Sequence, residues 1–353
     1  MNLAMERLRA IARTATAPGT LLEQRILELT GLPVVFRAAP DRLSAGVEAR
    51  LQPMREADDF AGLAIAFDRL FARRTFGGNG YRTYRIAENM LLTPVDEAIS
   101  MGEPSAAGEA LDRYRRWWLQ DRANPIAAAI LARALLTTGE ALDAHRFDSG
   151  VCDDEFLRDA CGEARGVLAR AGPNGRRHWL WRQADFTLAF CAWSCGAEDE
   201  ELLAVTFEAL QKLDPHEFGI YDDRTEHLLP EWAGSVAAID VFARAAAART
   251  AGRFGELMYA RIYDRALRFI DADQTGVDQD RLLRGFADWH ARFPTQAVAN
   301  RYAAHAHAFG ADAIVRGLFR DTLQEIQPAH WFDADQPLEA WYAICSLGKR
   351  LGI

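Results

Sequence analysis

The sequence has almost no lysine: Lys212 and Lys349 are its only two, so arginine carries nearly all of the positive charge. Acidic residues outnumber Lys and Arg by 50 to 41, which gives a net charge of −9 and a pI of about 5.5. A protein that neutralises many phosphates needs a basic surface. The charge balance therefore argues against a general nucleic-acid binder.

Long hydrophobic runs are also missing. No window comes near the roughly 18 consecutive apolar residues of a membrane-spanning helix, so we expect none and no membrane partner. The stretch 1–19 is basic and amphipathic, but it lacks the apolar run of a secretory signal. A transit peptide is the alternative interpretation of this stretch, and Glu6 counts against it. We therefore expect a cytoplasmic protein.

The five cysteines are an odd number in a long chain and do not predict a disulfide framework. Cys191 and Cys195 lie one helical turn apart and could supply two metal ligands. No second pair completes a tetrahedral site, because Cys152 and Cys161 are nine residues apart and Cys345 stands alone. The pattern predicts buried, reduced cysteines, with no metal and no cofactor.

Established catalytic motifs are absent as well. There is no HExxH, GxSxG, Walker loop or DxDxDG loop, and His305 and His307 point to different sides of a predicted helix. The glycine cluster at 75–80 (TFGGNG) has no Lys-Ser/Thr partner and follows no strand, so it indicates an interhelical loop rather than a phosphate cradle.

One acidic cluster stands beside a histidine: Asp222, Asp223 and Glu226 precede His227. Such a group could bind a cation or act in acid/base catalysis. Acidic residues at the start of a helix also interact favourably with the helix dipole, which is the structural interpretation. We expect a protein without enzymatic activity and keep an enzyme with an acidic/His site at these residues as the alternative.

Helical periodicity dominates what is present, and half of the residues are hydrophobic. The stretch 227–270 predicts a helical hairpin that opens after Pro230, Gly234 and Ser235 and turns at 252–255. Its predicted buried positions are Ile239, Phe242, Ala243 and Ala246 in the first helix and Tyr259, Ile262, Tyr263, Ala266 and Ile270 in the second. The second helix also carries an arginine stripe, for which a solvated face is the structural interpretation: Arg261, Arg265 and Arg268.

Prolines that follow a large apolar residue and a polar turn recur along the chain. Pro125, Pro173, Pro215 and Pro294 lie 48, 42 and 79 residues apart, and a period near 40 is typical of stacked helical hairpins. We predict an all-α, TPR-like α-α superhelix with an inner groove and little or no β structure, apart from a short extended piece at 32–36 (LPVVF). Residues 1–54 form an N-terminal helical arm, residues 55–353 the repeat domain, and residues 328–347 its C-terminal cap.

The central stretch also resembles a known family. LLPEWAGS, then FARAA and ART, then LMYARIY, is similar to the signature of a bacterial domain-of-unknown-function family of TPR-like helical proteins, and the likeness extends to RLFARRTFGGNGYRTYRIAENML and WHARFPTQAVANRYAAHAHAFGAD. The resemblance covers roughly residues 55 to 345. It implies the helical fold and supplies no established activity. Ala144, His145 and Arg146 depart from the expected Ala-Arg-Gly run.

Tryptophan, tyrosine and arginine gather in several predicted helices. Such residues are enriched at protein-binding hot spots, they also stack on single-stranded nucleic acid, and in a helical array they mostly fill gaps between hairpins. We predict a non-enzymatic module of the adaptor, chaperone or toxin-neutralising type that binds a protein or peptide in a groove. A single-stranded nucleic-acid binder is the second alternative. The candidate binding residues are Trp232, Tyr259, Arg261, Tyr263, Arg265, Arg268, Trp118 and Trp181.

Overall fold

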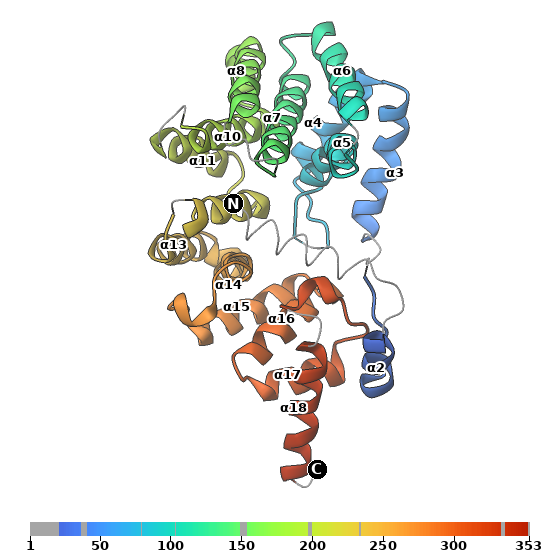
Figure 1. Cartoon of the computed structure of the whole chain (residues 1–353), viewed down its shortest axis with the longest axis vertical. Coiled ribbons are helices and arrows are strands. Elements are labelled where there is room, and N and C mark those ends of the chain that lie inside the picture. The colour runs from blue at the N-terminus through green and yellow to red at the C-terminus, as the bar shows by residue number, and fades with distance from the viewer. Residues whose placement is uncertain are drawn as a thin grey trace. The chain divides into compact units, whose positions relative to one another are not determined.

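The computed structural model describes residues 21–36, 41–78, 80–102, 104–148, 154–196, 200–232, 234–332 and 336–351. Over these residues the regular structure is helical, and the prediction of an all-α protein is confirmed. Two isolated bridges, Val34 with Ile326 and Phe76 with Arg82, are the β pairings of the described part. The first 20 residues of the predicted N-terminal arm lie outside the described residues. The chain divides into two compact units between Ile220 and Tyr221, within helix α12. Figure 1 colours the helices in chain order.

The first unit comprises residues 41–77 and 81–220. The predicted boundary at residue 54 falls inside its first helix, α3. The helices of this unit are α3 (Arg42–Glu56), α4 (Phe60–Arg73), α5 (Thr83–Ser100), α6 (Pro104–Gln120), α7 (Pro125–Asp148), α8 (Glu155–Arg170), α9 (Gly172–Gly175), α10 (Trp179–Ser194), α11 (Glu200–Leu213) and the first residues of α12 (Phe218–His227).

Helix α7 is the centre of this unit and packs against α6, α8 and α10. Its first turn is capped by Asn124, whose side-chain oxygen accepts from the N–H groups of Ile126 and Ala127. Gly139 lets α8 come close, since a Cβ there would lie 2.8 Å from the Cβ of Ala160. Over Pro125–Asp143 this helix is long and apolar enough to span a membrane, yet most of that stretch is buried, as in the core helix of a packed unit.

The repeated prolines fall at helix junctions. Pro125 begins α7, Pro173 lies in the short α9, and Pro215 and Pro294 lie in the loops before α12 and α16. Proline suits these places because it has no N–H to donate to a preceding turn. Pro94 is different, because α5 continues through it.

The second unit contains residues 21–36 and 221–351. Its elements are α2 (Leu21–Thr30), the rest of α12, η1 (Pro230–Trp232), α13 (Val236–Phe254), α14 (Leu257–Ala266), η2 (Ala272–Gln274), α15 (Gln279–Arg292), α16 (Gln296–Ala308), α17 (Asp312–Asp321), η3 (Pro328–His330) and α18 (Gln336–Leu351). The predicted cap at 328–347 corresponds to η3 and most of α18.

The predicted hairpin at 227–270 is present as α13 and α14. Ser235 caps α13 by accepting from the N–H of Ala238, and Gly255 ends it with a positive φ of 57°. The predicted apolar positions are buried in both helices, except that Phe242 is half-buried. Gly285 of α15 lets α14 approach, because a Cβ there would lie 2.5 Å from the carbonyl oxygen of Glu256.

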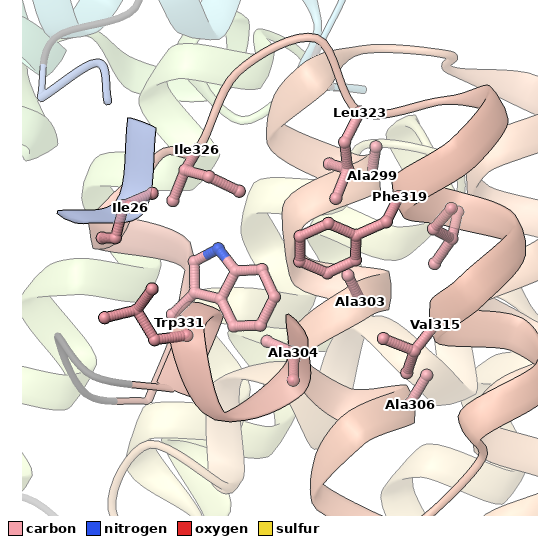
Figure 2. Close-up of a cluster of buried hydrophobic side chains, with 13 residues drawn as sticks. Ile26, Ala299, Ala303, Ala304, Ala306, Val315, Phe319, Leu323, Ile326 and Trp331 are labelled. Atoms are coloured by element: carbon pink, nitrogen blue, oxygen red, sulfur yellow. The ribbon is translucent and has the colours of Figure 1, made fainter. Parts of the chain in front are cut away.

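Residues from both ends of this unit share one hydrophobic cluster. Figure 2 shows Ile26 of α2, Phe319 of α17 and Trp331 converging on the alanines of α16. Buried Asn300 fixes the polar groups beside it, since its side-chain oxygen accepts from Trp331 Nε1 at 2.8 Å and from the N–H of Gln327 at 2.9 Å. The extended piece predicted at 32–36 meets Ile326 through the Val34 bridge.

Candidate binding site

The arginines predicted to form a stripe on α14 are held by carboxylates of α12. Arg261 donates to Asp222 at 2.8 and 2.5 Å, and Arg265 donates to Glu226. Both pairs join residues one turn apart on their helices, so they make two successive rungs between α12 and α14. The side chain of Arg261 is only 5% exposed, so the solvated-face interpretation does not hold at this position, whereas the side chain of Arg265 is 35% exposed.

A second ion cluster of α14 surrounds Asp264. This buried carboxylate accepts from Arg301 and lies 3.0 Å from His305 Nε2 and 3.9 Å from Arg268. Burial raises the pKa of Asp264, but the charges of Arg301 and Arg268 outweigh it and hold the pKa well below its ordinary value. Burial also lowers the pKa of His305, which Asp264 only partly offsets. The cluster ties α14 to α16 around a charged carboxylate.

The acidic cluster of α12 is divided rather than gathered at one place. Asp222 and Glu226 are engaged by arginines of α14, whereas His227 is buried, which lowers its pKa to about 3. An imidazole with that pKa is neutral at physiological pH and is a weak base. The alternative of an enzyme at these residues stays a prediction.

The predicted tyrosines of α14 lie inside the unit. Tyr263 donates to Asp240 at 2.9 Å, and the hydroxyl of Tyr259 accepts from the N–H of Asp278 at 3.1 Å. Burial raises the pKa of Tyr263 above its usual range. These side chains hold α13, α14 and the start of α15 together, and contact with a ligand stays a prediction for both.

The remaining candidates are arginines and tryptophans at several depths. Arg268 donates to the carbonyl of Ala329 at 3.3 Å, and Trp232 is half-buried in η1. Trp181 is buried and donates from Nε1 to the carbonyl of Leu168 at 3.0 Å, while half-buried Trp118 has the Arg122 guanidinium 5.1 Å from its ring. Their roles in binding also stay predictions.

The described cysteines do not assemble a metal site. Cys161, Cys191 and Cys195 are buried free thiols, Cys345 is exposed, and Cys152 lies outside the described residues. Cys191 donates to Glu140 at 3.4 Å, and burial raises the pKa of Cys161 to about 12. Among residues that the structure describes, no group of three or more His, Cys, Asp or Glu side chains has a metal-binding arrangement.

A cavity of about 550 Å³ opens between α5 and α6, which pack side by side in the first unit (Figure 1). Its α5 wall is one helical face: Pro94, Glu97, Ala98 and Met101. Its α6 wall consists of Glu109, Ala110, Asp112, Arg113, Tyr114 and Arg116. Apolar groups of both helices form much of the surface, and charged side chains stand among them. None of the eight predicted binding residues lines this cavity.

Pro94 explains how the α5 wall is held. Proline has no N–H, so the carbonyl of Met90, four residues earlier, loses its helical donor. Arg55 of α3 donates to that carbonyl at 3.0 Å. The hydroxyl of buried Tyr114 donates to the adjacent carbonyl of Leu91. Neighbouring helices thus grip α5 at the proline, immediately beside the cavity.

The α5 residues that line this cavity have a regular spacing in the sequence, but the spacing alone does not show that they border a cavity. Residues 94, 97, 98 and 101 have the i, i+3, i+4, i+7 spacing of a buried helix face. In the structure the last of them, Met101, is 65% exposed. The face that this spacing predicts to be buried is therefore exposed at its C-terminal end, and only the packing of α5 against α6 shows this.

The chain matches no family model, no curated protein and no solved structure. The resemblance to the family of TPR-like helical proteins therefore stays a prediction.

Proposed function

We propose that the protein is a non-enzymatic helical-repeat module, built as a TPR-like superhelix, that binds a protein or peptide segment in the groove between α5 and α6. The observation that carries the proposal is the open cavity walled by the C-terminal turns of α5, from Pro94 to Met101, and by α6. Helical hairpins commonly recognise a partner by accepting an amphipathic segment into such a groove.

The α5–α6 groove lies elsewhere in the chain than the groove of Trp, Tyr and Arg residues that the sequence predicts. The arginines and tyrosines of α14 are engaged in ion pairs, hydrogen bonds and packing. The α5–α6 groove instead exposes Met101, with the half-buried Pro94 and Ala110 beside it. Methionine adapts its shape to different apolar partners, which suits a binding surface.

Filling the groove tests the proposal. Peptides are selected from a displayed library of helical sequences against the purified full chain, and their dissociation constants are measured for the wild type and for Ala110→Trp. Ala110 lines the cavity and is only half-buried, so an indole there occupies the groove without entering the core. We expect affinity to fall by at least about tenfold, the scale of one hot-spot contact.

The matched control is Ala245→Trp, at an exposed position in the middle of α13. It should leave affinity unchanged, and circular dichroism should show both variants folded. Equal affinities of wild type and Ala110→Trp would show that the groove is not the binding place.

A further inference from the structure

The charges around the α5–α6 groove are not balanced. Arg113 and Arg116 both point to Asp58, which lies outside the lining, at 2.7 and 3.9 Å. Glu97 and Glu109 have no ion-pair partner among the described residues, and both are exposed. The two basic side chains of the groove thus share one carboxylate, while an acid from each wall faces the solvent without an ion-pair partner in the described part of the chain.

The third acid of the lining, Asp112, adds to the excess of negative charge around the groove. Asp112 lies 3.3 Å from Arg115, which also donates to Glu163, so that arginine is shared between two carboxylates. The field at the mouth of the groove is therefore negative. A negative mouth attracts a partner that carries positive charge and disfavours an acidic one.

The walls also indicate the shape of the partner. Pro94, Ala98 and Met101 lie along one face of α5, and Ala110 and Tyr114 lie one turn apart on α6. Two helical rows of this kind accept a third helix that lays an apolar stripe between them. Glu97 and Glu109 stand in the walls among these apolar residues, where cations that flank such a stripe would meet them.

We infer that the occupant of the groove is an amphipathic helix whose apolar stripe is flanked by lysine or arginine. The inference rests on the proposed function and adds the chemistry of the partner. The apolar stripe contacts Pro94, Met101 and Ala110, above the buried side chains of Ala98 and Tyr114. The flanking cations pair with Glu97 and Glu109.

Three designed peptides test the inference. They share one length and one apolar stripe, and the flanking positions are Lys in the first, Gln in the second and Glu in the third. Binding to the fluorescently labelled peptides is measured by anisotropy with the full chain at low and at physiological salt. We expect the Lys peptide to bind most tightly and the Glu peptide most weakly, and the advantage of the Lys peptide to shrink as salt rises.

The variant Glu97→Gln/Glu109→Gln should weaken the Lys peptide by about fivefold, the combined scale of two exposed ion pairs, and leave the Gln peptide unchanged. The control Glu201→Gln/Glu208→Gln removes the same net charge from the exposed face of α11 and should change neither affinity. Equal weakening in both double variants would assign the preference to net charge and overturn the inference.

Two outcomes separate this inference from the proposed function. If all three peptides bind equally and Ala110→Trp abolishes binding, the groove docks a helix and its charge preference is refuted. If no peptide binds, or Ala110→Trp has no effect on binding, the proposed function itself fails.

Discussion

Asp264 is a charged group in the interior of the second unit, and Arg268, Arg301 and His305 surround it. Arg301 and His305 come from α16, 37 and 41 residues further along the chain. Removing one member of such a buried group leaves the others without a partner, which costs several kcal/mol. The arginines of α14 and α16 therefore contribute to the specificity of helix packing whatever else they do.

Buried histidines make the unit sensitive to acid. Burial lowers the pKa of His227 to about 3, well below the ordinary value of about 6.5 that it regains on unfolding. Between these values the unfolded state binds a proton that the folded state does not, so stability is full above pH 6.5 and falls as the pH falls. At pH 5 the loss from this residue is about 2 kcal/mol.

Urea unfolding at pH 8 and pH 5 measures this loss. We expect His227→Gln to lose less stability than the wild type over the same interval, because it has no imidazole to protonate. The control His307→Gln lies on α16 with its side chain only half-buried and should keep the acid sensitivity of the wild type. A wild-type free energy of unfolding that is unchanged between the two pH values contradicts the prediction.

At the scale of elements, close helix pairs depend on glycine. A Cβ at Gly285 would lie 2.5 Å from the carbonyl oxygen of Glu256 and 2.7 Å from the Cβ of Ala260. Both atoms belong to rigid parts of the α14 segment, so α15 has to move away. We expect Gly285→Ala to lower the free energy of unfolding by about 1–3 kcal/mol, as overpacked cores do.

A second glycine provides the control for this prediction. Gly317 lies within α17, and a Cβ there would meet nothing within 4 Å. Gly317→Ala should raise the free energy of unfolding by up to about 1 kcal/mol, through helix propensity alone. Opposite signs in urea denaturation are the expected result, and a destabilisation of equal size at both positions would contradict the packing argument.

The helices and their buried faces could be predicted from the sequence, but the contacts between helices could not. The period of α13 and α14 predicted which apolar residues are buried, because one helix determines its own faces. For Arg261 and Arg265 the period indicated an arginine stripe and could not indicate its partners, because Asp222 and Glu226 come from 39 residues earlier. The cavity was missed for the same reason: it arises from the pairing of α5 with α6, and no single stretch encodes it.

At the scale of the whole molecule, the charge balance limits the choice of partner. The net charge is −9, and many arginines already pair with carboxylates of the chain. We expect no measurable binding to a single-stranded RNA oligonucleotide at physiological salt, because few cations are left to displace its counterions. Fluorescence anisotropy with a labelled oligonucleotide checks this.

The exposed pair Arg176 and Arg177 is the place to look if the RNA prediction is wrong. RNA binding that is tight, weakens steeply with salt and is lost in Arg176→Ala/Arg177→Ala would contradict the prediction. It would locate an RNA-binding site at these two arginines. Weak retention only at very low salt is the nonspecific behaviour of any arginine-bearing surface and agrees with the prediction.

Pro94 affects both the thermal stability of the fold and its ability to bind a ligand. An alanine at this position would donate to the carbonyl of Met90 and compete with Arg55 for it, so α5 would gain an internal hydrogen bond and lose its hydrogen bond to α3. Selection for thermal resistance alone would favour this exchange. The same substitution would loosen the α5 wall beside Tyr114, so the more stable variant would bind its ligand more weakly.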